Sequence, residues 1–230
     1  MCRVRNSKVL YICKKSDMHF LSPILENYIQ NNSEDEPKIL QELTRETHLK
    51  ILRPRMLTGH FQGRVLSILS KIIAPKNILE IGTYTGYSAI CLAEGMQPNG
   101  QLHTIDINEE LQDIQRKYFD KSGHGSQISQ HIGDAKSIIP KLNITFDLVF
   151  IDAEKKDYPD YFELVLKKTR PGSVILSDNV LWSGKVVEPI EKKDKVTSIL
   201  FNYNKLLKED ERVETVLLPV RDGLTLTRVL

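Results

Sequence analysis

Residues 77–88 constrain the fold more than any other part of this sequence. They read Asn-Ile-Leu-Glu-Ile-Gly-Thr-Tyr-Thr-Gly-Tyr-Ser, which is an apolar strand with an acid, then a turn with two glycines, then the start of a helix. Gly82 and Gly86 lack a Cβ, so the backbone there can turn sharply and a ligand can approach it closely. A strand, a glycine turn and a helix in this order are typical of a nucleotide-type cofactor site in an α/β fold.

The acid Glu80 narrows the class of ligand that this turn can hold. A dinucleotide site reads G-x-G-x-x-G and seats a pyrophosphate on the helix N-terminus, whereas this turn reads G-x-x-x-G with a carboxylate before it. A carboxylate repels phosphate and attracts a cation. The turn therefore suits a ligand with an ammonium group and no phosphate, such as the methionine part of S-adenosylmethionine. An NAD-dependent oxidoreductase is the less favoured alternative.

A second acid stands at the end of the next expected strand, 101–106. In βαβ cofactor folds an acid at this position binds the ribose hydroxyls, and we expect that role for Asp106. The alternative is that Asp106 only starts a turn before Asn108 and caps the helix that follows.

Apolar periodicity and turn residues predict the other elements. Strands and helices alternate from residue 77, which predicts a Rossmann-like α/β fold with a mostly parallel sheet and helices on both faces. Asp222-Gly223 predicts a hairpin that makes the C-terminal strand antiparallel. The seven expected strands are 77–81, 101–106, 127–132, 146–151, 173–177, 213–219 and 224–229, and the expected helices, of which the first two are extra N-terminal ones, are 21–31, 37–48, 60–74, 87–97, 108–122, 135–140, 157–168 and 194–209.

Two of these helices carry apolar stripes. The stripe in 21–31 predicts a contact with the core or with a second copy of the chain. The stripe in 60–74 is explained equally well by such a contact and by packing of this helix on the sheet. The stripes consist of Phe20, Leu21, Ile24, Leu25, Tyr28 and Ile29, of which Phe20 lies outside the residues that the structure describes, and of Phe61, Val65, Leu66, Leu69, Ile72 and Ile73.

Length and charge bound the organisation of the chain. Its 230 residues fit one α/β domain, which we expect at 18–230. Residues 1–17 hold five of the 32 basic and one of the 30 acidic residues, and we expect this basic leader to be disordered or not native.

The net charge of +2 argues against a broad basic surface for nucleic acid. No apolar run approaches the roughly 20 residues of a membrane span, and the three cysteines lack metal-ligand spacing, so a cytoplasmic location is expected.

Oxygen ligands end two later strands of the expected sheet. Asp152 follows the strand 146–151, and Asp178 and Asn179 follow the strand 173–177. In an open parallel sheet, ligands bind outside the carboxyl ends of the strands, so these three side chains should converge. Two carboxylates and one amide, without His or Cys, suit Mg²⁺, Mn²⁺ or Ca²⁺ better than zinc. The alternative is that the Asp-Asn pair is only a turn.

Lys155 comes three residues after Asp152 and is expected to point into the same cleft. Burial and a nearby cation both favour the neutral amine of a lysine, which makes Lys155 a candidate general base. The alternative is that Lys155 and Lys156 are surface charges. Trp182, the only tryptophan, follows the metal pair, where it forms a wall against an aromatic acceptor or packs as an ordinary loop residue.

Five segments are distinctive when they are taken together: Met56-Leu-Thr-Gly-His-Phe-Gln-Gly63, Leu79-Glu-Ile-Gly-Thr-Tyr-Thr-Gly-Tyr-Ser88, Phe150-Ile-Asp-Ala-Glu-Lys155, Asp178-Asn-Val-Leu-Trp182 and Leu218-Pro-Val-Arg-Asp-Gly-Leu224. With them, the sequence from about residue 20 to the C-terminus resembles the cation-dependent O-methyltransferases, the family of caffeoyl-CoA and catechol O-methyltransferases. The resemblance implies a class I, S-adenosylmethionine-dependent and divalent-metal-dependent enzyme. Such an enzyme methylates one hydroxyl of a vicinal aromatic diol, such as a catechol or caffeate, and is commonly a homodimer.

The resemblance also implies roles for single residues. It assigns the metal to Asp152, Asp178 and Asn179, and the proton transfer to Lys155. It assigns binding of S-adenosylmethionine to Thr58, Glu80, Gly82, Thr83, Tyr84, Ser88, Asp106 and Ala135.

The sequence departs from the plant pattern of this family at two positions. Gln62 stands where the plant pattern has Glu, and Ser183 stands where it has an Asn that touches the substrate. Trp182 and Ser183 are therefore candidate substrate residues, while specificity for a CoA ester stays open. Two further alternatives are a metal-independent methyltransferase of nucleic acid or protein and a non-catalytic module with this fold. The first gives Asp152, Asp178 and Asn179 no joint purpose.

Overall fold

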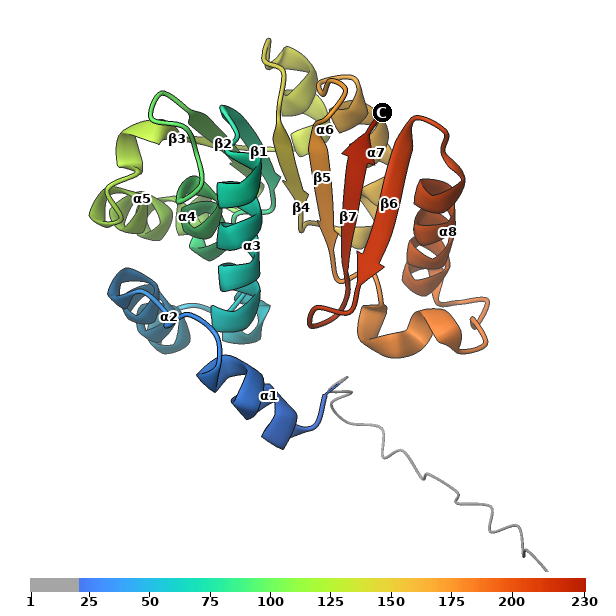
Figure 1. The fold of residues 1–230 in the computed structure, drawn as a ribbon, viewed down its shortest axis with the longest axis horizontal. Helices are drawn as coiled ribbons and strands as arrows, with labels where there is room; N and C mark the ends of the chain where they lie inside the picture. Colours follow the sequence, from blue (N-terminus) through green and yellow to red (C-terminus); the bar gives the residue numbers. More distant parts are fainter. Residues whose placement is uncertain (1–20) are drawn as a thin grey trace, which may run out of the picture.

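The protein is described by a computed structural model of residues 21–230, so the predicted leader at 1–17 lies outside the described residues. Its centre is a seven-stranded sheet in the order β3-β2-β1-β4-β5-β7-β6 (Figure 1). β7 is antiparallel to β5 and β6, and the pairs among β1 to β5 are parallel. The predicted reversal of the last strand is therefore confirmed. The strands are β1 (Asn77–Ile81), β2 (Gln101–Asp106), β3 (Ile128–Ile132), β4 (Leu148–Ile151), β5 (Val174–Asp178), β6 (Val213–Leu218) and β7 (Leu224–Val229).

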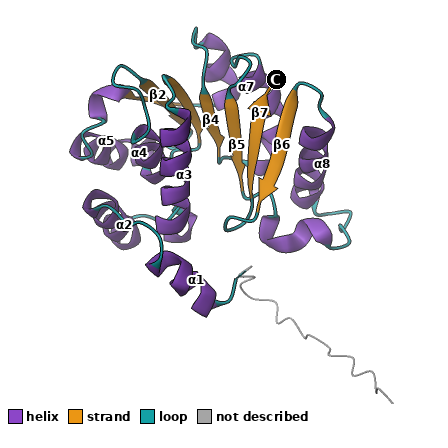
Figure 2. Cartoon of the chain, viewed as in Figure 1, coloured by secondary structure: helices purple, strands orange, loops and turns teal. Residues whose placement is uncertain are grey.

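Helices flank the strands on both sides, as Figure 2 shows. The α-helices are α1 (Pro23–Asn31), α2 (Lys38–Lys50), α3 (His60–Ile73), α4 (Tyr87–Ala93), α5 (Gln112–Lys121), α6 (Ala135–Ile138), α7 (Tyr158–Leu166) and α8 (Lys195–Glu209). Short 3₁₀ segments, which the periodicity did not predict, are η1 (Pro54–Met56), η2 (Glu109–Leu111), η3 (Gly125–Gln127), η4 (Ile139–Lys141), η5 (Lys155–Asp157) and η6 (Trp182–Val187).

The sheet buries both of its faces. Side chains alternate along each strand, so Ile78 belongs to the core shared with α2 to α5, whereas Leu79 belongs to the core shared with α6 to α8. Every residue of β4 is buried, which is why this strand is a continuous apolar run. Burying each such side chain stabilises the fold by about 1.5–3 kcal/mol. Within residues 21–230, no helix combines the length and the apolar composition needed to cross a membrane.

The first helix does not take part in the core. α1 buries none of its residues, and Ile24 is 85% exposed. Of the two contacts predicted for its apolar stripe, the one with the core is therefore wrong. α1 lies beyond α2 and α3, on the side of the molecule where the β6–β7 turn lies (Figure 1).

The buried face of α3 is more polar than its apolar stripe predicts. Gln62, Arg64 and Ser67 are buried, whereas Ile72 is 74% exposed. The reason is that α3 packs against α4, where Glu94 accepts hydrogen bonds from Arg64 Nη2 at 2.8 Å and Ser67 Oγ at 2.6 Å. Packing is confirmed for Leu66, which lies in the core, and for Val65, Leu69 and Ile73, which pack against it. It is wrong for Ile72, because the polar contacts with Glu94 turn another part of the helix inward.

Candidate active site

The carboxyl ends of β1, β2, β4 and β5 meet at one edge of the sheet, and most of the predicted site residues lie there. Gly82 and Gly86 have φ angles of 98° and 92°, which confirms the predicted sharp turn. An added Cβ on Gly82 would lie 2.0 Å from the carbonyl oxygen of Asp152, and one on Gly86 would lie 2.6 Å from Phe119. Both glycines are thus required by close contacts within the protein. These contacts do not test the predicted close approach of a ligand to the turn.

Asp106 fixes the glycine turn from the end of β2. Its Oδ2 accepts hydrogen bonds from the backbone N–H groups of Thr83 (3.1 Å) and Tyr84 (2.7 Å), and its Oδ1 accepts one from Asn108 N at 2.9 Å. Asn108, and not Asp106, caps the next helical turn through Glu110 N. Of the alternative for Asp106, the turn before Asn108 is therefore confirmed and the helix cap is wrong. The Asp106 carboxylate thus links the end of β2 to the turn after β1, at the edge of the sheet where the cofactor is expected to bind.

Glu80 is a completely buried acid with one unsatisfied oxygen. Thr104 Oγ1 donates to its Oε2 at 2.5 Å, whereas Oε1 has no hydrogen-bond partner among the described residues. Burial raises the pKa of Glu80 to about 8, and the hydroxyls of Ser88 and Thr104 oppose this increase. An orphaned carboxylate oxygen is a place where a cationic group can bind.

The other predicted cofactor residues surround this turn. Tyr84 Oη donates to the carbonyl oxygens of Leu52 (3.1 Å) and Arg53 (3.2 Å), so the segment before α3 lies over the turn. Thr58, in the same segment, is buried. Ala135 is the buried first residue of α6, which follows the end of β3 at this edge. Thr83 and Ser88 are also buried.

The three predicted metal ligands follow neighbouring strands. Ile151 pairs with Ser177 in the β4–β5 ladder, so Asp152 and Asp178 are adjacent. Burial, and after it the negative charge of Asp152, raises the pKa of Asp178 well above its usual range. The Asn179 side chain makes no hydrogen bond within residues 21–230. Two acids that repel each other, beside a free amide, fit a hard divalent cation.

Lys155 lies against this pair, as predicted. It is 8% exposed, and its Nζ donates to Asp152 Oδ1 and to Tyr158 Oη, each at 2.8 Å. Tyr158 Oη in turn lies 2.9 Å from the carbonyl oxygen of Asp178. The surface-charge alternative is therefore wrong for Lys155, whereas Lys156 is exposed.

Trp182 and Ser183 lie in η6, just after the metal pair. Both have positive φ angles, 49° and 53°. Trp182 is partly buried and packs against the core shared with α6 to α8, which supports its packing role. Ser183 is exposed, and its backbone N–H donates to Asp222 Oδ1 at 2.6 Å.

Two residues of this edge had no predicted role in the metal set. Gln62 Nε2 donates to Asp178 Oδ2 at 2.7 Å, and Arg221 Nη1 donates to Gln62 Oε1 at 3.3 Å. In the sequence, Gln62 was marked by its departure from the plant pattern and by its place in the segment 56–63, and Arg221 only by its place in the segment 218–224. Among the described residues, no three His, Cys, Asp or Glu side chains form a metal cluster, so the predicted set depends on the Asn179 amide.

A cavity of about 870 Å³ lies away from this edge, between residues 34–38 and α3. It is lined by charged and polar side chains that include Glu34, Lys38 and Lys71, and by none of the predicted site residues. The strand-end arrangement, and not this cavity, is therefore the candidate active site.

Comparison with known proteins identifies the family of the chain. The family described as O-methyltransferase matches residues 30–230. Caffeoyl-CoA O-methyltransferase from Petroselinum crispum is 35% identical over 204 residues, which cover 84% of this chain and 84% of that protein. Caffeoyl-CoA O-methyltransferase 2 from Zea mays is 36% identical over 204 residues, which cover 84% of this chain and 77% of that protein.

Solved structures show the same fold. The O-methyltransferase TomG from Streptomyces achromogenes, in complex with SAM, has a TM-score of 0.82 and 30% identity, and the match covers 90% of this chain and 96% of that one. An O-methyltransferase from Bacillus cereus, in complex with SAH, has a TM-score of 0.83 and 29% identity, with coverage of 90% and 97%. The chain therefore belongs to the O-methyltransferase family.

Proposed function

We propose that this O-methyltransferase uses S-adenosylmethionine and a divalent cation to methylate one hydroxyl of a vicinal aromatic diol. One observation carries the proposal. Two acids that repel each other, the buried Asp178 and the partly exposed Asp152, lie at the carboxyl ends of adjacent strands, with Lys155 hydrogen-bonded to Asp152. The acid with the orphaned oxygen, Glu80, lies on β1, which pairs with β4.

For the cofactor, TomG in complex with SAM supports the same ligand here. S-adenosylmethionine supplies a methyl group on a sulfonium. We assign its ammonium group to Glu80, because burial and an unsatisfied oxygen leave that acid without a cationic partner. We assign its ribose hydroxyls to Asp106, which is already oriented by three backbone N–H groups.

For the metal, the donor set fits Mg²⁺, Mn²⁺ or Ca²⁺, which Asp152, Asp178 and Asn179 would hold through oxygen. A bound cation would supply positive charge that lowers the pKa of an adjacent acceptor hydroxyl. A metal-independent methyltransferase would not need two acids and an amide placed together in this way.

Lys155 is the residue that takes the acceptor proton at Nζ. Asp152 and Tyr158 hold this nitrogen from two sides, so its position is fixed. Its burial also keeps water from competing for the proton. Holding the acceptor and the methyl group in reacting geometry can supply roughly 7–11 kcal/mol of the barrier.

The acceptor is a small phenolic molecule in this proposal. The named activity of the plant relatives, on caffeoyl-CoA, supports a diol of the caffeate type. Trp182 and Ser183 border the metal pair and would contact the aromatic ring. We also propose a cytoplasmic homodimer, for which the exposed apolar side chains of α1, such as Ile24 and Tyr28, offer a contact surface.

The test is methyl transfer to caffeate and to protocatechuate with Mg²⁺ and then with EDTA, with a monophenol as the control acceptor. The proposal requires product from the diols that disappears with EDTA, and none from the monophenol. Product that survives EDTA would instead support the metal-independent alternative.

A further inference from the structure

The side chain of Gln62 is buried between an acid and a guanidinium. It is 0% exposed, its Nε2 lies 2.7 Å from Asp178 Oδ2, and its Oε1 lies 3.3 Å from Arg221 Nη1. Arg221 is a donor only and an ionised carboxylate is an acceptor only. The amide therefore has one favourable orientation, because a flip would place donor against donor and acceptor against acceptor.

This orientation restrains the carboxylate of Asp178. Oδ2 receives the Gln62 amide, and Oδ1 receives the backbone N–H of Asn179 at 2.8 Å. Each oxygen has two lone pairs, so each keeps one free. With both oxygens held, the carboxylate cannot rotate without losing a hydrogen bond in a buried site, which is costly.

Arg221 lies in the β6–β7 turn and is held in place by the segment before α3. Its Nη1 also donates to the carbonyl oxygens of Leu57, at 3.3 Å, and Thr58. The turn is tight against η6, since a Cβ on Gly223 would lie 2.5 Å from Leu181 Cγ. The C-terminal hairpin thus reaches both the segment that carries Thr58 and, through Gln62, the acid Asp178.

We propose that Gln62 is a positioning residue for Asp178, and that Arg221 fixes the orientation of Gln62. This rests on the proposed role of Asp178 as a metal ligand. Hydrogen bonds to a ligating carboxylate orient it and raise the affinity of the site, and their loss typically costs 10- to 100-fold in metal affinity or activity. The C-terminal hairpin is thereby part of the metal site, although it supplies no ligand.

The experiment measures the affinity for Mn²⁺ by electron paramagnetic resonance, without acceptor, and the affinity for S-adenosylhomocysteine separately. Gln62→Met keeps the length of the side chain and removes both hydrogen bonds. We expect its Kd for Mn²⁺ to rise by about tenfold or more, with the affinity for S-adenosylhomocysteine unchanged.

Gln115 offers a matched control. It is another buried glutamine, but its Nε2 donates to the carbonyl oxygen of Tyr84, at 2.7 Å, in the glycine turn. Gln115→Met should therefore weaken binding of S-adenosylhomocysteine and leave the Kd for Mn²⁺ unchanged. A general loss of packing would instead affect both ligands in both variants.

Arg221→Met tests the second part of the proposal. The Kd for Mn²⁺ should rise by about two- to tenfold, the loss expected for one hydrogen bond. Arg228→Met is its control on the same hairpin, because Arg228 is exposed and pairs with Glu214 at 2.8 Å. This control should bind Mn²⁺ like the wild type.

The outcomes separate this proposal from the function on which it rests. A wild-type protein that does not bind Mn²⁺ would overturn the metal site and the role of Gln62 together. If the wild type binds Mn²⁺ and a folded Gln62→Met variant binds it equally well, only the role of Gln62 is overturned. If Gln62→Met does not fold, Arg221→Met decides, and unchanged Mn²⁺ affinity in that variant overturns the proposal.

Discussion

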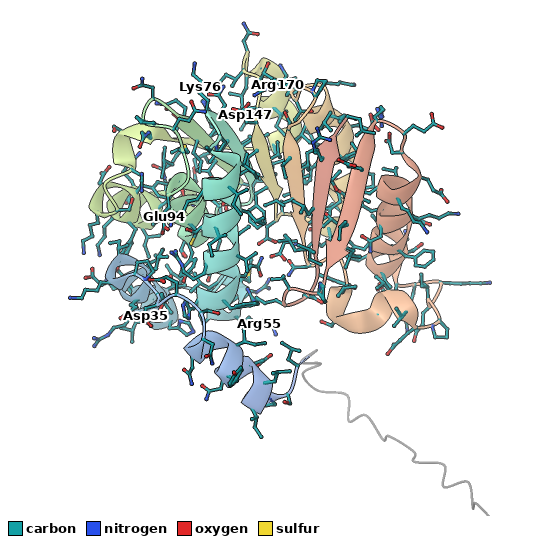
Figure 3. The ribbon with its side chains drawn as sticks, in the orientation of Figure 1. Asp35, Arg55, Lys76, Glu94, Asp147 and Arg170 are labelled. Atoms are coloured by element: carbon teal, nitrogen blue, oxygen red, sulfur yellow. The ribbon has the colours of Figure 1, made fainter. Side chains whose placement is uncertain are left out.

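Two acids flank the same strand, β4, and they differ in their neighbours. Asp147 precedes the strand and accepts hydrogen bonds from Asn77 N at 3.0 Å and Arg170 Nη2 at 2.6 Å. Burial alone would raise its pKa, but these partners outweigh it and the pKa is lowered. Figure 3 shows Asp147 with Lys76 and Arg170 at the far edge of the sheet. Asp152 follows the strand and contacts Lys155, next to the frustrated acid Asp178.

Glu80 and Glu94 repeat this contrast in adjacent elements. Glu94 is paired with Arg64, Ser67 and Lys71, whereas Glu80 is buried with an unsatisfied oxygen. Satisfied acids stabilise the fold, and unsatisfied acids at the carboxyl ends of strands are available to a ligand. The environment of a carboxylate, more than its presence, therefore separates the acids that we propose as functional from the acids that stabilise the fold.

The largest effect is expected from removing an acid of the proposed metal set. Asp178→Ala should lower kcat by at least about 100-fold, the scale seen when a group that stabilises developing charge is lost. Binding of S-adenosylhomocysteine, measured by calorimetry, should stay near the wild-type value. Loss of cofactor binding would show that the two groups of acids are not separate sites.

Glu80→Gln should weaken cofactor binding by about ten- to 100-fold, the value of a hydrogen bond to a charged group.

Glu80→Gln should also stabilise the protein at high pH. Burial raises the pKa of Glu80 from 4.5 to about 8, so folding takes up a proton, and stability is lost as the pH rises from 4.5 to 8. Melting curves at pH 6 and pH 8.5 should show the gain mainly at the higher pH. A lower melting temperature at pH 8.5 would contradict this.

Glu94→Gln should have the opposite signature. Burial raises the pKa of Glu94, but Arg64 and Ser67 outweigh it and lower the pKa to about 2. Its contribution is therefore complete above pH 4.5 and is lost as the pH falls towards 2. The variant should lose about 2 kcal/mol in urea unfolding at pH 7, and less at pH 3. Cofactor affinity should not change, and a change would mean that this cluster is coupled to the site.

Trp182→Leu should have the smallest effect of these substitutions. If the indole forms a wall for the acceptor, KM for a catechol should rise by about two- to tenfold, the value of an aromatic contact. The affinity for S-adenosylhomocysteine should not change. A lower melting temperature with unchanged KM would instead assign Trp182 to packing alone.

The sequence was informative where a structural feature is continuous along the chain. The strands of the sheet were predicted because apolar runs end in turn residues, and Asp152, Asp178 and Asn179 were found because they follow those runs directly. The position of Lys155 was also predictable, since it lies three residues after Asp152 in the sequence, and it contacts Asp152 at 2.8 Å.

Contacts between distant residues were not predictable. Gln62 and Asp178 are 116 residues apart, and Gln62 and Arg221 are 159 apart, so no local pattern joins them. The buried face of α3 was misjudged for the same reason, because Glu94 on the neighbouring helix makes burial of Arg64 favourable. The sequence also did not show why a glycine is required at position 82, since the atom that would clash with a Cβ there is the carbonyl oxygen of the distant Asp152.

The most direct test of this account compares Asp147→Asn with Asp152→Asn, the two acids that flank β4. Methyl transfer to a catechol with Mg²⁺ and the melting temperature are measured for each. We predict that Asp152→Asn loses transfer and stays folded, whereas Asp147→Asn keeps transfer and melts about 3–10 °C lower. Wild-type transfer by Asp152→Asn would contradict the assignment of function to the acids at the carboxyl ends of the strands.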